Sequence, residues 1–336
     1  MKALMIHGKD DIRLDEVPTP EPTGDQVRVK MAFGGICGSD LHYYFEGKNG
    51  EFVVREPLCP GHEMSGTVDL DPSGEYEPGT PVTFHPATFG TPEEGLEDKP
   101  NLWPNGAYLG SASTWPHTQG AMSEYYLFDK SQLRRLPEGL SLKDAALAEP
   151  LAVGLHAIKI AGGVEGKKVL VSGSGPIGLL LVAAAVSLGA AEVTATDVLD
   201  GPLERAASVG ATRTINVTAE QIPALTYDVA FEASGVPVAI TPVMAAVRRA
   251  GTVVQVGMLP DEPRPINLAA FVSKEITYHG TFRFSDEVDQ AVEMLASDPR
   301  IAGVVTHVIP AEDAVEAFET AKNSQISGKV LVELWG

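Results

Sequence analysis

The sequence has little cysteine and no secretory leader at its amino terminus. Cys37 and Cys59 are the two cysteines among 336 residues, and the chain turns polar from His7 onward. A signal peptide needs a longer apolar stretch than this, and low cysteine use is typical of a reducing compartment. We therefore expect a cytoplasmic protein.

Basic residues and long apolar runs are also scarce. Lys and Arg number 25 against 45 Asp and Glu, which gives a formal net charge of −20. Such a chain repels phosphate-rich polymers unless it carries a local basic patch, and the sequence has none. The longest apolar run, residues 178–188, is too short to span a bilayer. We expect neither a nucleic acid nor a membrane as a partner.

The length predicts two domains, because single cores usually stop growing below about 300 residues. Residues 1–149 are rich in Pro and Gly and contain short alternating stretches such as 26–32, which indicate small strands joined by turns. From residue 151 onward, strands and helices alternate. This pattern favours an α/β protein with a doubly wound parallel sheet in its second region.

The alternation can be followed element by element. Strands are predicted at 168–172, 192–196, 228–232 and 252–256, and helices at 151–161, 176–188, 202–209 and 238–249. After residue 281, the sequence predicts two amphipathic helices, 286–296 and 312–322, and a last strand, 329–334.

A glycine-rich loop follows the first of these strands. Gly173, Gly175 and Gly178 form a G-x-G-x-x-G pattern between the strand and an apolar helix. The first glycine allows a tight turn, the second lets the backbone approach a pyrophosphate, and the third permits close helix packing. Pro176 suits the first helical turn, whose free N–H groups attract phosphate. The loop predicts a dinucleotide site; a turn that only packs a helix on a sheet is the alternative.

An acidic residue, Asp197, ends the next predicted strand. Its carboxylate can accept hydrogen bonds from both adenosine ribose hydroxyls and would repel a 2′-phosphate, so NAD is favoured over NADP. The predicted cofactor-binding set also includes Ile177, Val256 and Gly257.

Four residues are candidates for a metal site: Cys37, His62, Glu63 and Glu149. Zinc accepts thiolate, imidazole and carboxylate ligands, and a catalytic zinc keeps one position open for water or substrate. Their spacing alone does not distinguish them from a chance set.

The sequence around these residues is more specific. GGICGSDLH at 34–42, PGHE at 60–63 and AEPLAV at 148–153 resemble the zinc-dependent medium-chain dehydrogenase family in its polyol branch. The resemblance runs essentially end to end and includes GSGPIG at 173–178. Within the branch, residues 34–50, 110–117 and 282–287 look most like the L-idonate 5-dehydrogenases, followed by the sorbitol and xylitol dehydrogenases.

The resemblance implies a fold and a division into domains. It implies a GroES-like, β-rich catalytic domain formed by residues 1–150 and 281–336, and a Rossmann NAD-binding domain formed by residues 151–280. The family usually forms homodimers or homotetramers through its nucleotide-binding domains.

The resemblance also implies roles for the metal candidates. It places Cys37, His62 and Glu63 on one catalytic zinc, with Glu149 as a fourth ligand or as the partner of the zinc-bound water. Zinc would lower the pKa of a substrate secondary alcohol, whose carbon then delivers hydride to NAD.

Further residues match the family's proton relay and substrate pocket. Ser39, or a water with His42, would pass the proton to solvent, unless His42 is an ordinary surface histidine. Tyr43 and Arg283 match positions that line the polyol pocket; a packed aromatic and a surface salt bridge are the respective alternatives. An aldonate substrate would also need a cation for its carboxylate, and Arg283, Lys48 and Arg55 are candidates.

The chain departs from the family pattern at three points. Residues 86–104 lack the four cysteines that hold a structural zinc in many relatives, so we expect no structural zinc. This lobe must then be held by a neighbouring subunit or by packing, for which Trp103, Tyr108 and Trp115 are candidates. Cys59 replaces an aliphatic residue, and Pro202 stands where NAD-linked relatives often carry Arg, which leaves the strictness of NAD selectivity open.

Two other functions were weighed against a polyol or aldonate dehydrogenase. One is an inactive homologue that serves as a binding or structural protein, and the other is a zinc-free quinone reductase of the same superfamily. Retention of all four metal candidates together with the full glycine pattern argues against both.

Overall fold

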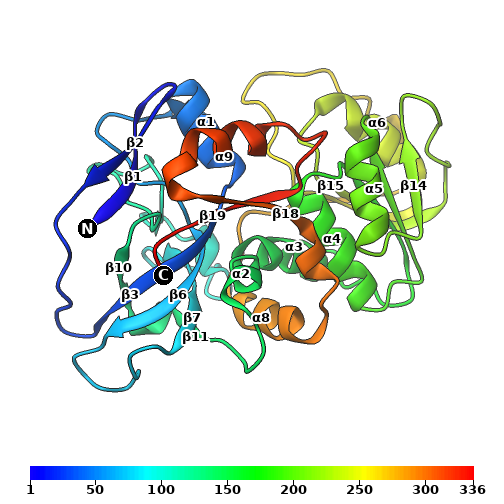
Figure 1. Ribbon diagram of the computed structural model, residues 1–336. Helices are drawn as coiled ribbons and strands as arrows, with labels where there is room; N and C mark the ends of the chain where they lie inside the picture. Colours follow the sequence, from blue (N-terminus) through cyan, green and yellow to red (C-terminus); the bar gives the residue numbers. More distant parts are fainter.

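A computed structural model describes residues 1–336 and shows two lobes side by side, each built on its own sheet (Figure 1). The lobe drawn in green and yellow holds six parallel strands in the order β14-β13-β12-β15-β16-β17. Their bounds are Arg213–Asn216, Glu192–Asp197, Lys168–Ser172, Tyr227–Glu232, Val247–Gln255 and Thr277–Gly280. This is the Rossmann order, with a switch point between β12 and β15 where parallel sheets bind ligands.

Helices cover both faces of this sheet, so its central strands are buried. Val169, Leu170 and Val171 of β12 have no exposed surface, as expected of a parallel sheet with two covered faces. The helices here are α3 (Ala148–Ile160), α4 (Pro176–Ser187), α5 (Asp200–Ser208), α6 (Pro237–Ala246) and α7 (Ala269–Ser273). Helix α4 is apolar on nearly every side because α3, β12 and β13 surround it.

The other lobe is built on a seven-stranded, mainly antiparallel sheet of order β11-β7-β6-β3-β19-β18, with β10 also paired to β3. The strands span Leu133–Arg135, Pro81–Phe84, Glu63–Leu70, Gln26–Gly35, Lys329–Glu333, Val305–Pro310 and Tyr125–Asp129, in that order. Three two-stranded sheets surround it: β1 with β2 (Lys2–Gly8, Asp11–Glu16), β4 with β5 (Lys48–Asn49, Phe52–Val53) and β8 with β9 (Ala87–Thr88, Ala107–Tyr108).

The helices of this lobe and the carboxyl-terminal segment complete the fold. Helices α1 (Gly38–Glu46), α2 (Leu142–Ala145) and α9 (Ala314–Lys322) belong to the β-rich lobe, and four 3-10 helices span Pro100–Leu102, Lys130–Gln132, Ile301–Val304 and Ala311–Asp313. Strands β18 and β19 join the sheet of β3, whereas α8 (Val288–Ser297) packs on α3. The domain limits at residues 150 and 281 stay predictions.

The α/β fold class predicted from the sequence is confirmed, and the differences lie at three edge strands and at the end of one helix. The sequence analysis did not include β14, β17 or β18, each of which is an edge strand. Edge strands keep one side exposed and have a weak apolar pattern. The helix predicted at 238–249 ends at Ala246, because Val247 to Gln255 form strand β16. No helix is both long enough and apolar enough to cross a membrane.

A buried carboxylate, that of Glu287, links the start of α8 to α3. Glu287 accepts hydrogen bonds from His156 Nδ1 at 2.9 Å and from Lys159 Nζ at 3.0 Å, both on α3, and from the Ser285 N–H at 2.8 Å. Burial alone would raise the pKa of Glu287, but these hydrogen bonds lower it to about 2. The ionised carboxylate therefore stabilises the position of α8.

We predict that Glu287→Gln lowers the free energy of unfolding by about 2 kcal/mol at pH 7, because a buried charged acceptor is lost. The pKa of Glu287 is depressed in the folded state, so the stabilisation is full above its ordinary value of 4.5 and is lost as pH falls towards 2. Urea unfolding at several pH values would measure this. Asp286→Asn, which alters an exposed carboxylate on Lys159, is the control; an equal loss in both variants would contradict the prediction.

Candidate metal and dinucleotide sites

Three of the four predicted metal ligands meet at one point. Cys37 precedes helix α1, and His62 and Glu63 lie at the start of β6; the pairing of Gly35 with Glu63 brings the two segments together. The ligand atoms of Cys37, His62 and Glu63 lie within 4.8 Å of one another. A single ion can therefore contact all three.

A glycine makes this approach possible. A Cβ atom on Gly35 would lie 2.1 Å from Glu63 Oε2, which no side chain can tolerate. Gly35 is thus required by the position of the Glu63 carboxylate.

Asp40 was not among the predicted site residues, yet it orders the cluster. It has no exposed surface and accepts hydrogen bonds from the Cys37 N–H at 2.9 Å and the Gly61 N–H at 3.4 Å. The signal in the sequence is an acidic residue three positions after Cys37, which is the spacing of a helix-capping interaction.

The donor set fits a zinc ion. His62 is 5% exposed, and its Nδ1 atom is buried without a hydrogen-bond partner. Burial alone would lower the pKa of His62, but the acidic groups of Cys37, Asp40 and Glu149 raise it to about 10. The cluster therefore attracts positive charge, and thiolate, imidazole and carboxylate are ligands that zinc prefers.

Glu149 lies beside the cluster rather than within it. It stands in the first turn of α3 and is 6% exposed, and the three-residue group does not include it. Tyr108 donates its hydroxyl to Glu149 Oε1 at 2.5 Å. Burial raises the pKa of Glu149 to about 7, although the charge of His62 opposes this. Glu149 can thus hold a proton near neutral pH.

Lys329 is the second residue that the sequence analysis missed. Its ammonium donates to both carboxylate oxygens of Glu63, at 2.8 and 2.5 Å, and to the Ile36 carbonyl at 3.1 Å. Lys329 is 2% exposed and Glu63 is 1% exposed. Lys329 begins strand β19 and is followed by three buried apolar residues, and a cation beside such a run was the available signal.

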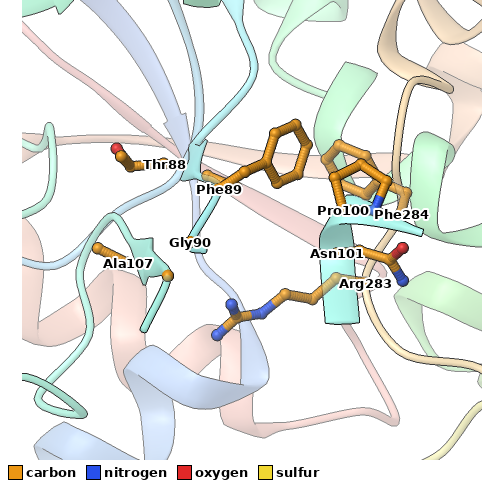
Figure 2. A pocket seen from close by; sticks show the side chains of 10 residues that line it. Thr88, Phe89, Gly90, Pro100, Asn101, Ala107, Arg283 and Phe284 are labelled. Atoms are coloured by element: carbon orange, nitrogen blue, oxygen red, sulfur yellow. The ribbon is translucent and has the colours of Figure 1, made fainter. Parts of the chain in front are cut away.

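Arg283 and Tyr43 differ in their accessibility. The Arg283 guanidinium lies 4.0 Å above the Tyr108 ring and 4.8 Å from the Phe282 ring, and it makes neither an ion pair nor a hydrogen bond. Figure 2 shows it extending into a hollow beside Gly90 and Ala107. Tyr43 is 1% exposed and accepts a hydrogen bond from the Ala112 N–H at 3.0 Å, so it is packed in the core.

The two predicted relay residues lie on helix α1. Ser39 is half-buried in its first turn, and His42 is exposed and shares a hydrogen bond with Glu46 Oε1 at 3.1 Å. Because residues three apart share a helix face, the two residues lie on the same side of α1.

The glycine-rich loop lies at the switch point of the parallel sheet. Gly173 has φ = +93°, and a Cβ atom there would lie 2.7 Å from the Ser234 nitrogen. A Cβ atom on Gly178 would lie 1.9 Å from the Gly173 carbonyl oxygen. Helix α4 then begins at Pro176, with Gly175 at its N-cap and Ile177 in its first turn. The free N–H groups of this turn suit a pyrophosphate.

The other predicted cofactor residues lie at the same edge of the sheet. Asp197 ends β13, and its carboxylate accepts from the N–H groups of Ser174 at 2.9 Å and Val198 at 2.7 Å. Val256 and Gly257 follow β16, and both donate to the Glu232 carbonyl at 2.8 Å.

The lobe at residues 86–104 is held by its own hydrogen bonds and packing. Trp103 Nε1 donates to the Leu96 carbonyl at 2.8 Å, and the Thr91 N–H donates to the Pro104 carbonyl at 2.9 Å. The expectation that Trp115 packs here was wrong, because Trp115 is 63% exposed. Tyr108 is buried, but its hydroxyl is directed at Glu149.

A Rossmann sheet with a glycine-rich loop, beside a β-rich lobe with a largely buried cysteine–histidine–glutamate cluster, is typical of a metal- and dinucleotide-dependent oxidoreductase. Residues 23–138 match the alcohol dehydrogenase GroES-like domain, and residues 176–297 match the zinc-binding dehydrogenase domain. The chain belongs to the zinc-dependent medium-chain dehydrogenase family, in its polyol dehydrogenase branch.

Individual relatives agree with this family. The chain is 36% identical to the sorbitol dehydrogenase of Bos taurus, over 98% of this chain and 95% of that protein. The crystal structure of L-idonate 5-dehydrogenase from Escherichia coli superposes with a TM-score of 0.93 at 33% identity, covering 99% of this chain and 98% of that one. A zinc-binding dehydrogenase from Sinorhizobium meliloti, solved with NADP, has a TM-score of 0.88 at 27% identity. This match covers 99% of this chain and 98% of that one. Zinc and NAD(P) are thus the metal and coenzyme of the family.

We predict that Lys329→Met lowers the free energy of unfolding by about 3 kcal/mol, because it leaves the Glu63 carboxylate buried without its cation. Urea unfolding in the presence of a chelator would measure the loss. Removing both charges, in Lys329→Met with Glu63→Gln, should recover part of it. Lys168→Met, which breaks an exposed pair with Glu192, is the control and should cost less than about 1 kcal/mol. A double variant less stable than Lys329→Met would contradict the prediction.

Proposed function

We propose that this protein oxidises a secondary alcohol of a sugar acid with NAD, as an L-idonate 5-dehydrogenase. The observation that carries the proposal is the guanidinium of Arg283, which has no anionic partner although it lies on Tyr108, the hydrogen-bond partner of Glu149. Burial lowers the pKa of Arg283, so a bound carboxylate would supply a missing counter-charge. Arginine matches a carboxylate with two parallel hydrogen bonds.

The three candidate cations for the substrate carboxylate differ in their exposure to solvent. Lys48 and Arg55 are exposed, where water already solvates their charge. Arg283 is half-buried, and its charge interacts with that of Glu149. We therefore assign the carboxylate of the substrate to Arg283 and its hydroxyl-bearing chain to the space between Arg283 and the metal cluster. A neutral polyol, as for the sorbitol dehydrogenase relatives, is the alternative substrate.

The proposed metal is one catalytic zinc on Cys37, His62 and Glu63, with Glu149 either as a fourth ligand or acting through water. When bound, zinc supplies a Lewis acid that lowers the pKa of the substrate alcohol. No structural zinc is proposed, because residues 86–104 lack cysteine.

The chain's own residues position the substrate and move its proton. Lys329 neutralises part of the buried negative charge and holds the Glu63 carboxylate in place. Ser39, or a water with His42, would relay the alcohol proton to solvent, with each group releasing one proton as it accepts another. Tyr43, whose hydroxyl accepts a hydrogen bond from the Ala112 N–H, would line the substrate pocket together with Arg283.

NAD is the proposed coenzyme, on Gly173, Gly175, Pro176, Ile177 and Gly178. Asp197 would accept hydrogen bonds from the adenosine ribose and repel a 2′-phosphate. Val256 and Gly257 would line the site at the carboxyl end of β16. When bound on these residues, NAD would supply the hydride acceptor for the reaction.

We predict NADH formation from L-idonate, faster with NAD than with NADP and abolished when zinc is chelated. Metal analysis should give one zinc per chain. Cys37→Ala should lose zinc and activity together, whereas Cys59→Ala, which alters the buried cysteine outside the cluster, should keep both.

The other outcomes of this assay separate the alternatives. Turnover of sorbitol and xylitol without L-idonate would move the substrate to the neutral polyols and keep the zinc mechanism. Turnover that survives chelation would refute the metal assignment. A zinc-free protein without any turnover would be the inactive homologue.

We also propose a homodimer or homotetramer formed through the nucleotide-binding domains, taken as residues 151–280, with residues 1–150 and 281–336 as the catalytic domain. Strand β17 is an unpaired edge, and Tyr278, Val272 and Met258 are exposed apolar side chains of the same region. Such edges and patches favour association. Light scattering should give a multiple of the chain mass, and Val272→Asp should reduce it; a monomeric wild-type protein would refute the proposal.

The cytoplasm is the proposed compartment, because a Cys37 ligand must stay reduced; a secreted protein would refute this.

A further inference from the structure

The backbone at Arg283 adopts a conformation that few residues adopt. Its φ angle is +52°, in the left-handed region that glycine favours and other residues avoid. Such a residue keeps this conformation only when neighbouring groups hold it there. The groups that hold Arg283 thus decide where its guanidinium lies.

One of these groups comes from the cysteine-free lobe. Asn101 Nδ2 donates a hydrogen bond to the Phe282 carbonyl at 2.9 Å. This carbonyl belongs to the peptide unit that precedes Arg283, and the orientation of that unit sets the φ angle of Arg283. On the other side, His85 Nε2 donates to the Ser285 carbonyl at 2.9 Å. The segment that carries Arg283 is therefore held at both ends.

Figure 2 shows the consequence for the side chain. Asn101 lies beside the backbone of Arg283, and the guanidinium extends away from it towards Gly90 and Ala107. The guanidinium lies 4.0 Å from the centre of the Tyr108 ring and 4.8 Å from that of the Phe282 ring, and Tyr108 donates to Glu149. A rotation of the Phe282–Arg283 peptide would move the guanidinium out of this position.

The amide of Asn101 has no comparable role inside its own lobe. Its Oδ1 atom is buried and has no hydrogen-bond partner. The lobe is closed by other bonds, from Trp103 to Leu96 and from Thr91 to Pro104. The one hydrogen bond that the Asn101 side chain makes thus crosses to the segment of Arg283.

We propose that Asn101 is a positioning residue for substrate recognition: it fixes the Phe282–Arg283 peptide so that the guanidinium meets the carboxylate of a sugar acid. This inference rests on the proposed function. On this proposal, the cysteine-free lobe at residues 86–104 is part of the substrate site. The contact from Asn101 would then favour acidic substrates over neutral ones.

The test compares Asn101→Ala with Leu102→Ala, the neighbouring residue of the same turn, which is 44% exposed and controls for loosening of the lobe. Asn101→Ala should raise KM for L-idonate about tenfold, with kcat within about twofold, because the carboxylate meets a displaced guanidinium. Its KM for sorbitol should change less than about threefold. Leu102→Ala should leave both KM values near those of the wild type.

A double-mutant cycle then shows whether Asn101 acts through Arg283. In an Arg283→Met background, Asn101→Ala should have no further effect on kcat/KM for L-idonate. Three results would overturn the role of Asn101 and leave the proposed substrate standing. They are losses of kcat/KM that multiply in the double variant, an equal rise in KM for L-idonate and sorbitol, and an Asn101→Ala variant that behaves as the wild type. A wild-type enzyme that turns over no sugar acid would overturn the proposed substrate and this inference together.

Discussion

The site depends on the register of three adjacent strands. Gly35, near the end of β3, is paired with Glu63 of β6 on one side and with Leu331 of β19 on the other. This register places Cys37, His62 and Glu63 together and brings Lys329, from the far end of the chain, onto the Glu63 carboxylate. Because a shift of one residue turns every side chain of a strand to the other face, the cluster exists only in this alignment.

Buried charge is the second constraint on the site. Cys37, Asp40, Glu63 and Glu149 are acidic groups in a small volume, and His62 and Lys329 are the cations among them. The surplus of acid raises the pKa of His62 to about 10 and, with burial, keeps a proton on Glu149 near neutral pH. A divalent cation would neutralise the same surplus of negative charge without a proton. The surplus of acidic groups therefore accounts both for these raised pKa values and for the site's affinity for zinc.

The cysteine-free lobe is joined to the segment that carries Arg283. Residues 86–104 contain no cysteine, and the lobe is closed by a tryptophan side chain and backbone hydrogen bonds. Through Asn101, it reaches the segment at residues 282–285. That segment also touches the parallel sheet, since the Thr281 N–H donates to the Gln255 carbonyl at 3.2 Å. Arg283 thus lies where the lobe, the metal cluster and the coenzyme domain meet.

The sequence by itself determined what depends on local pattern. The alternation of strands and helices predicted the α/β class, and the glycine-rich loop with Asp197 predicted a dinucleotide site, because neighbouring residues build both features. The motifs around Cys37, His62 and Glu149 predicted the metal ligands, and the structure brings Cys37, His62 and Glu63 together. The tertiary structure alone decided the edge strands, whose apolar pattern is weak, and the partners Asp40, Lys329 and Asn101. Lys329 meets Glu63, and Asn101 meets the Phe282 carbonyl, across more than half of the chain, and only strand register and lobe packing bring such distant groups together.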